Sequence, residues 1–507
     1  MIRLVTLVSF WTLALGVSAQ NDSVRYDYMW YMGYDEFNGN PIFGTSVFDF
    51  NNDTLEVYSD DASDIDALAT NATVCDADGN FIFFTNGAYI FDASQTFMQG
   101  GDTLSTAEYV LDDYEQGLFI EQGALALPHP GDDERWHLFH KYVSTTIHFI
   151  YSVYAPEVLH TTIDMSLNGG LGGVETLGES IMQGFLTPGE LTACRHANGR
   201  DWWLLFYGNW SNEYHTYLLD PDGLHDTGSQ IVGDSVKGGL GTARFSTDGS
   251  KFIRMNTINN TLGGNLDIYD FDRCTGELSN QLHINYPNSG TPGVSTSPSS
   301  QYLYVCRTDT ILQYDLWASD IAASETVVAV YDGIPSPLTG FSSHFSMCSL
   351  APDGKIYVMP ATTQEMVHVI HHPDSGGVAC EVEQKAFALP HINRSMPNFP
   401  HYRLGRLEGS ACDTVYNTST PVMEVPGEGM GEVRIYPNPA RDEVRIDYTG
   451  DALVTEVVVY DISGRRVASY DVRVHSSFSI TGLPPGMYLC QVKSDHDIIT
   501  TQKLLVE

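Results

Sequence analysis

Alternating oxygen-bearing side chains make the segment Asp49-Phe50-Asn51-Asn52-Asp53 the clearest candidate for binding a cation. Carboxylate and amide oxygens are the ligands that Ca²⁺ prefers in loops. Thr54 stands where a calcium loop of the EF-hand type needs glycine, so the pattern is incomplete. Calcium held by Asp49, Asn51 and Asp53 is therefore one hypothesis, and a solvated acidic loop is the other.

Two further groups contain residues of a metal-binding or catalytic type. His368 and His372 lie on the same face of an extended segment and could share a metal, but the sequence places no acidic third ligand nearby. Asp132, Asp133 and Glu134 are of the type used in glycoside hydrolysis, although a turn before a strand also explains them. The sequence has no H-E-x-x-H, G-x-S-x-G or Walker motif, so we predict no catalytic residue.

The composition limits the classes of partner. The chain has 507 residues, and its 25 Lys and Arg against 64 Asp and Glu give a formal net charge of -39. Such a charge repels phosphate backbones and anionic lipids, which argues against nucleic acid and membrane surfaces as partners. With 42% hydrophobic and 11% aromatic residues, the chain still has enough apolar surface for a folded core.

The first residues have the pattern of a signal peptide. Arg3 supplies the positive charge, Leu4 to Gly16 form an apolar run, and Val17-Ser18-Ala19 places small residues at a cleavage site before Gln20. The apolar run is too short to cross a bilayer, which needs about 20 residues. We therefore expect residues 1–19 to be removed between Ala19 and Gln20, leaving a mature chain without a transmembrane segment.

Eight cysteines are compatible with disulfides in an exported protein. No two of them form a C-x-x-C pair, which argues against a zinc or thioredoxin-like site. Cys306 and Cys490 lie in apolar, strand-like segments that favour buried thiols. The spacing leaves the pairing open.

From about Val24 to Leu407 the sequence consists of short aromatic and β-branched segments separated by turn residues, which predicts strands. A turn followed by an apolar strand recurs, and its last four copies are spaced about 50 residues apart. The repeated turns are Asp78-Gly79, Asn198-Gly199, Asp248-Gly249, Ser299-Ser300 and Asp353-Gly354. Glycine supplies the positive φ that tight hairpins need.

A second, alternating strand follows several of these units, so each unit predicts a small antiparallel sheet of about four strands. Radial repetition of such sheets produces a β-propeller, here over residues 20–407 with about seven blades. Six or eight blades are also possible because the first 130 residues repeat poorly. A β-helix would repeat at a shorter period, and a series of sandwiches would lack the regular turn. The segment Ala351–Tyr357 resembles the strand lead-ins of WD40-like propellers.

Residues 408–432 are rich in Gly, Pro, Ser and Thr and predict a linker. From Val433 the sequence changes to strands joined by Gly and Pro turns, and about 75 residues can support a small, Ig-like β-sandwich. Its prominent blocks, in order, are Tyr436–Ala440, Val457–Val467, Gly482–Leu489 and Lys503–Val506.

These four blocks resemble the type A C-terminal sorting domain of Bacteroidetes type IX secretion (Por system) cargo. The resemblance covers residues 433–507, and its motif residues are Tyr436, Pro437, Asn438, Pro439, Gly464, Arg465, Gly486 and Tyr488. It implies export across the outer membrane by the type IX machinery, removal of the domain by a processing peptidase, and release or attachment at the cell surface.

The activity of the propeller region is not specified by any motif. Ser395-Met396-Pro397-Asn398-Phe399 resembles segments of other secreted Bacteroidetes propellers, and that resemblance implies no activity. The main hypothesis is a secreted or surface module that binds an extracellular polysaccharide or protein. The alternatives are a propeller enzyme acting on polysaccharide, with carboxylates around the central channel, and a structural or adhesive surface protein.

Overall fold

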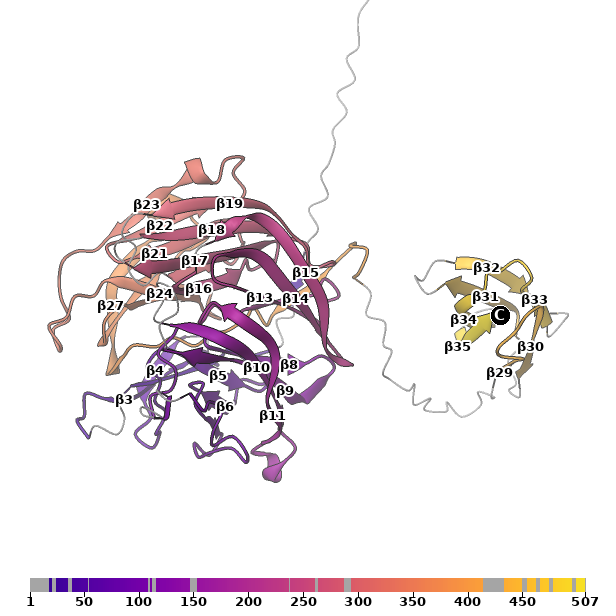
Figure 1. The fold of residues 1–507 in the computed structure, drawn as a ribbon, viewed down its shortest axis with the longest axis horizontal. Coiled ribbons are helices and arrows are strands. Elements are labelled where there is room, and N and C mark those ends of the chain that lie inside the picture. The colour runs from indigo at the N-terminus through magenta and orange to yellow at the C-terminus, as the bar shows by residue number, and fades with distance from the viewer. Residues whose placement is uncertain are drawn as a thin grey trace, which may run out of the picture. The chain divides into compact units, whose positions relative to one another are not determined.

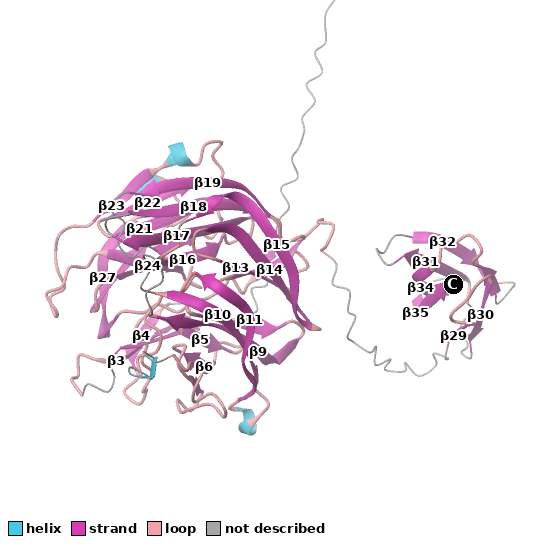
Figure 2. Cartoon of the chain, viewed as in Figure 1, coloured by secondary structure: helices cyan, strands magenta, loops and turns pink. Residues whose placement is uncertain are grey.

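The computed structural model describes residues 18–20, 24–34, 39–52, 54–107, 110–111, 115–145, 153–236, 238–259, 263–286, 293–413, 433–448, 454–461, 466–473, 477–494 and 498–506. The chain forms two compact units, residues 1–416 and 417–507, which are described separately. Both units consist almost entirely of strands (Figure 2). The exceptions include short 3₁₀ turns at Asn168–Gly170 (η2), Ala322–Ser324 (η3) and Gly377–Cys380 (η4). No helix among the described residues is long and apolar enough to cross a membrane.

Seven antiparallel sheets of three or four strands in the described part of the first unit are called blades 1 to 7 in chain order. Blades 3 to 7 each have four strands that pair in sequence order. Blade 3 consists of β8 (Ala124–His129), β9 (Asp132–Ser144), β10 (Tyr154–Asp164) and β11 (Gly173–Leu186), and blade 4 of β12 (Ala193–Arg195), β13 (Trp202–Tyr207), β14 (Ser211–Asp220) and β15 (Gly223–Val236). Blade 5 consists of β16 (Leu240–Phe245), β17 (Lys251–Asn259), β18 (Gly263–Phe271) and β19 (Leu278–Tyr286), and blade 6 of β20 (Gly293–Thr296), β21 (Tyr302–Arg307), β22 (Thr310–Asp315) and β23 (Thr326–Val330). Blade 7 consists of β24 (Phe345–Leu350), β25 (Ile356–Pro360), β26 (Gln364–Ile370) and β27 (Val382–Asn393).

Blades 1 and 2 differ from the predicted four-stranded repeat, because each has three strands among the described residues. Their strands are β2 (Met29–Tyr34), β3 (Gly44–Asp49), β4 (Glu56–Ser59) and β5 (Ala72–Cys75), β6 (Phe81–Thr85), β7 (Ile90–Asp92). This shortening explains why the first 130 residues showed a poor sequence repeat. The prediction of about seven blades is confirmed.

The blades form a closed ring. The first strands of successive blades contact one another, as in the pairs β5 with β8, β12 with β16, β16 with β20 and β20 with β24. The last strand of blade 7, β27, packs on β2, β3 and β4 of blade 1. Figure 1 shows this closure, with β27 in orange beside β3 and β4 in indigo. The first strands therefore surround the centre of a seven-bladed β-propeller.

The repeated turns join the first and second strand of a blade, as their chemistry predicted. Gly79, Gly199, Gly249 and Gly354 all have positive φ, between 73° and 92°. A β-carbon at these positions is unfavourable in that backbone conformation, which accounts for the recurring glycine. In blade 6 the turn instead uses Ser300 at φ 64°.

The second unit is a two-sheet β-module. One sheet has the order β29 (Val433–Tyr436), β30 (Glu443–Tyr448), β33 (Ser477–Ser479), and the other β32 (Arg466–Asp471), β31 (Glu456–Asp461), β34 (Gly486–Lys493), β35 (Ile498–Val506). Alternating residues of both sheets, such as Val444, Ile446, Val457 and Val459, are buried in one shared core. The packing of two sheets over one core is that of the predicted β-sandwich.

Six cysteines among the described residues are buried thiols, including Cys306 and Cys490. Cys274 and Cys412 form a disulfide across 138 residues of sequence. Cys274 lies in the turn between β18 and β19 of blade 5. The disulfide therefore fixes the chain just beyond the last blade to the turn between the third and fourth strands of blade 5.

Blade 3 contains a row of hydrogen-bonded histidines across its sheet. His137 Nε2 lies 2.9 Å from His129 Nδ1, and His137 Nδ1 lies 2.7 Å from His160 Nε2. Burial lowers the pKa of His137 to about 3 and that of His160 to about 4. His140, on the same blade, has a pKa of about 3 for the same reason. These imidazoles are neutral at physiological pH.

We expect the propeller to lose stability as the pH falls below about 6.5, because the unfolded chain then protonates these histidines and the folded chain does not. Each buried histidine contributes a slope of about 1.4 kcal/mol per pH unit between the unfolded pKa and its own lowered pKa. The measurement is denaturant unfolding between pH 7.5 and 5. His140→Gln should reduce the pH slope by about one proton relative to the unchanged protein. A slope equal to that of the unchanged protein would contradict this account.

Candidate functional site

Two places in the molecule are candidate sites. One is formed by the first and last blocks of the C-terminal unit, which contain predicted motif residues. The other is the centre of the propeller, where polar groups are buried. In the C-terminal unit the side chain of Asn438 joins those two blocks. Its Nδ2 donates to the Lys503 carbonyl at 2.7 Å, and its Oδ1 accepts from Leu505 N at 2.8 Å. Ala440 N also donates to the Leu505 carbonyl at 2.8 Å. The Tyr436–Ala440 block therefore lies along the terminal strand β35 and pairs with its backbone.

The remaining motif residues occupy different environments. Tyr488 is buried, and its hydroxyl donates to the Pro484 carbonyl at 2.7 Å, which closes the turn before β34. Gly486 is the first residue of that strand. Tyr436 is 40% exposed, and a hydrogen bond to Asp447 raises its pKa.

Pro437 and Pro439 flank Asn438, and Gly464 and Arg465 lie outside the described residues. The described motif residues thus combine a backbone clamp, a closed turn and one exposed aromatic ring.

The predicted signal-peptide cleavage site lies against the propeller. Ala19 and Gln20 belong to β1 (Ser18–Gln20), which pairs antiparallel with β28 (Leu404–Leu407). Cleavage before Gln20 would leave that residue as the start of the mature chain, next to the strand that follows the last blade. The cleavage itself stays a prediction.

The centre of the propeller is occupied by the chain itself. Residues 395–405, which we call the plug, follow β27, return to the middle of the ring and end within β28. The plug makes hydrogen bonds with residues of blades 2, 3, 4 and 5 and packs on Trp30 of blade 1. A segment that contacts residues from five of the seven blades lies near the centre of the ring.

Asn398 anchors the part of the plug that lies where the first strands begin. It is 3% exposed, and its Nδ2 donates to the carbonyls of Ala124 and Leu191, both at 2.9 Å. Its Oδ1 accepts from Gln122 Nε2 at 3.0 Å, and its backbone N donates to the Asn71 carbonyl at 2.8 Å. Asn398 thereby satisfies polar groups of blades 3 and 4 with its side chain and of blade 2 with its backbone nitrogen.

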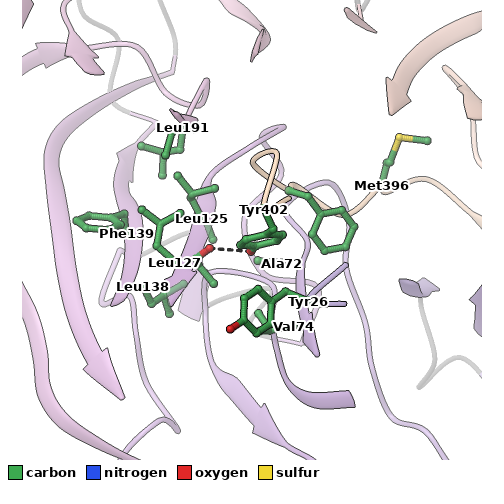
Figure 3. Packing of buried hydrophobic residues seen from close by; sticks show 14 of the residues in the cluster. Tyr26, Ala72, Val74, Leu125, Leu127, Leu138, Phe139, Leu191, Met396 and Tyr402 are labelled. Carbon is green, nitrogen blue, oxygen red and sulfur yellow. Dashed lines mark hydrogen bonds between the residues drawn. The ribbon is translucent and has the colours of Figure 1, made fainter. Parts of the chain in front are cut away.

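Tyr402 anchors the plug farther along β8. Its hydroxyl donates to the Ala126 carbonyl at 2.8 Å, and its ring lies among Tyr26, Leu125 and Leu127 (Figure 3). Contacts with β8 thus progress from Ala124 to Ala126, so the plug runs along the first strands from where they begin towards where they end.

Arginines fix the plug backbone. Arg244 of β16 donates through one terminal nitrogen to the Phe399 carbonyl at 2.9 Å, and Arg273 donates to the Gly405 carbonyl. Arg403 of the plug forms an ion pair with Asp27 of blade 1. Next to them, burial and the nearby Arg403 and Arg273 lower the pKa of His401 to about 3. The exit of the channel is therefore more positive than the strongly acidic chain as a whole.

The predicted calcium residues form a turn in the described part of the chain. Asp49 Oδ1 accepts from Asn51 N at 2.8 Å, and Asn51 Nδ2 donates to the Gly79 carbonyl at 2.9 Å. Asp53 lies outside the described residues. The described residues contain no group of three or more His, Cys, Asp or Glu side chains that could hold a metal ion. Calcium at this loop stays a prediction.

The other candidate groups are not assembled into a shared site. His371 Nε2 lies 2.8 Å from Glu383, whereas His372 Nε2 lies 3.3 Å from Glu381. His368 is buried on β26. Asp132 begins β9, and its Oδ1 accepts from Glu134 N at 3.0 Å, as in a turn before a strand. No motif in the sequence indicates that residues 395–405 lie in the channel, although Ser395–Phe399 resembles segments of other secreted propellers.

The model of the secretion system C-terminal sorting domain matches residues 434–507. None of the curated proteins compared with the chain matches it significantly. Among solved structures, a putative 6-phosphogluconolactonase from Bacteroides fragilis is 13% identical, with coverage of 73% of this chain and 97% of that one and a TM-score of 0.38.

The Dos1 propeller is 10% identical, with coverage of 75% of this chain and 87% of that one and a TM-score of 0.41. PorZ, a surface component of the type IX secretion system of Porphyromonas gingivalis, is 11% identical, with coverage of 92% and 63% and a TM-score of 0.34. These structural similarities are too distant to indicate an activity.

The matched residues contain the Asn438 clamp, the Tyr488 turn and the two-sheet core described above. A domain of this kind marks a protein as type IX cargo, which is secreted or attached to the cell surface. Residues 434–507 are a type IX secretion C-terminal sorting domain, carried by a chain whose larger unit is a β-propeller.

Proposed function

We propose that the propeller is an extracellular binding module for a polysaccharide or a protein, delivered by its sorting domain. The observation that carries this proposal is the plug. A propeller enzyme of the type considered above would place its carboxylates around the central channel, and here the channel holds the chain's own residues 395–405.

Two buried carboxylates near the channel are paired with arginine. Asp27 pairs with Arg403, and Glu190 lies 3.1 Å from Arg254, with neither side chain of the second pair exposed. Paired, water-excluded carboxylates are poorly suited to exchange protons with a polymeric substrate. The geometry therefore favours binding on the outside of the ring over catalysis inside it.

An ordered loop between blades 6 and 7 supplies such an outer surface. Ile334, Leu338 and Phe341 are 57%, 53% and 55% exposed. The base of the loop is fixed, because Ser336 N donates to the Phe341 carbonyl and the Ser336 hydroxyl binds the buried Glu365 carboxylate. Apolar side chains held out on a fixed loop are typical of protein-binding surfaces. Of the two classes of ligand, this loop favours a protein.

The test uses the mature full-length protein with a photoreactive amino acid at position 341, exposed to cells of a type IX-competent host. A specific cross-linked protein at position 341, absent when the probe replaces the exposed Ile231 on β15, would support a protein ligand. A glycan array with the same protein tests the polysaccharide class. Hydrolysis of an array glycan, or no binding in either assay, would contradict the proposal.

A further inference from the structure

A small cavity remains between the plug and the first strands of blades 4 to 7. Its volume is about 50 Å³. A water molecule needs about 10–15 Å³ measured in this way, so the cavity has room for about four waters or one small polyatomic ion. Its lining includes the cationic side chains of Arg244 and Arg403, the hydroxyls of Ser295, Thr296 and Ser349, and the neutral imidazole of His401.

The charges at the cavity favour an anion. Among the described residues that line it, the one carboxylate is Asp27, and Asp27 is already paired with Arg403. Arg244 forms no ion pair within the described part of the chain, and one of its terminal nitrogens donates to the Phe399 carbonyl. The guanidinium therefore keeps its positive charge without a counter-ion in a chain of net charge -39.

One donor of a residue that lines the cavity lacks an acceptor. Arg244 Nε is inaccessible to solvent and has no hydrogen-bond partner among the described residues. A buried N–H without an acceptor is costly, and guanidinium donors match the geometry of oxyanions. Ser295, Thr296 and Ser349, which also line the cavity, carry hydroxyls that can donate to an anion.

We propose that this cavity binds a small oxyanion, such as sulfate, phosphate or a carboxylate, between Arg244 and the plug. The anion accepts hydrogen bonds from Arg244 and from the hydroxyls of β20 and β24, and so bridges the plug to blades 5, 6 and 7. Among the described residues, Asn398 makes its side-chain hydrogen bonds to blades 3 and 4, and Arg244 and Arg273 of blade 5 donate to plug carbonyls. The bound anion acts as a structural ligand that holds the plug on this side of the channel.

The experiment follows the thermal unfolding of the mature full-length protein at constant ionic strength. Sodium sulfate, phosphate and acetate are titrated separately against sodium chloride. A bound oxyanion at tenfold its Kd should raise the unfolding temperature by about 2 °C relative to chloride. The three arms distinguish tetrahedral anions from carboxylates.

Arg244→Gln should abolish the oxyanion-dependent shift, and Arg244→Lys should retain part of it. Arg406→Gln is the matched control, because Arg406 is an exposed arginine paired with Glu408. Since Arg244 also holds the plug, Ser349→Val supplies a second variant that removes one hydroxyl donor and should reduce the shift. A shift equal to that of chloride, or a full shift in Arg244→Gln, would overturn the proposal.

Discussion

Deleting Gly431–Glu507 is expected to change the protein from one found outside the cell to one retained in the periplasm. The deletion removes the whole sorting domain and leaves the propeller unit, including the Cys274–Cys412 disulfide, intact. The core of the sorting domain is its own, so its removal exposes no propeller core. The loss should therefore reflect recognition by the secretion machinery and not misfolding. Fractionation of a type IX-competent host, with immunodetection of the propeller, measures it.

The reciprocal experiment fuses residues 431–507 to an unrelated protein with a signal peptide, which should then reach the surface or the medium. Within the domain, Asn438→Ala should reduce export, because it breaks both side-chain hydrogen bonds of Asn438 to β35 and leaves only that of Ala440 N to the Leu505 carbonyl among the hydrogen bonds described above. Thr481→Ala, at an exposed position of the same domain, is the control. If the truncated protein reaches the outside as efficiently as the full chain, residues 431–507 are not the sorting signal.

Replacing Asn398 by Ala is expected to destabilise the propeller more than any surface substitution. It leaves the Ala124 and Leu191 carbonyls and the Gln122 amide without their partner in a buried place. Each unsatisfied buried group costs about 1–3 kcal/mol, so a total loss of about 3 kcal/mol or more is expected. Denaturant unfolding of the full-length protein, followed by tryptophan fluorescence, gives the loss directly.

The control is Asn212→Ala, which removes one hydrogen bond, to the Gly233 carbonyl, at the protein surface. It should cost about 1 kcal/mol or less. Tyr402→Phe, which removes only the hydroxyl bonded to Ala126, should give an intermediate loss. Equal unfolding midpoints for the Asn398 and Asn212 variants would show that the plug does not stabilise the ring.

The features that sequence predicted are those with short-range causes. The Asp-Gly turns before apolar strands depend on the backbone preference of one or two residues, as the positive φ of Gly249 and Gly354 shows. Their regular spacing predicted about seven blades, and the structure confirms this. The blocks of the sorting domain could also be recognised in the sequence, because each block is a local turn or strand pattern and the blocks follow one another in a fixed order.

Blades 1 and 2 show where local patterns are insufficient. Each has three described strands, so the count of strands in a blade did not follow from the turn repeat. The calcium hypothesis rested on the oxygen pattern of Asp49 and Asn51, and the hydrogen bonds of both residues are those of a turn. A loop pattern of alternating oxygens is shared by turns and by cation sites, and the sequence does not separate the two.

The sequence by itself thus determined the strand class, the repeat, the exported character and the sorting domain. Only the tertiary structure decided that residues 395–405 fill the channel, that Cys274 pairs with Cys412, and that Arg244 faces a cavity. The reason is the length of the loops involved. Asn398 meets groups near residues 71, 124 and 191, and contacts over such separations leave no periodicity or turn signature in the chain.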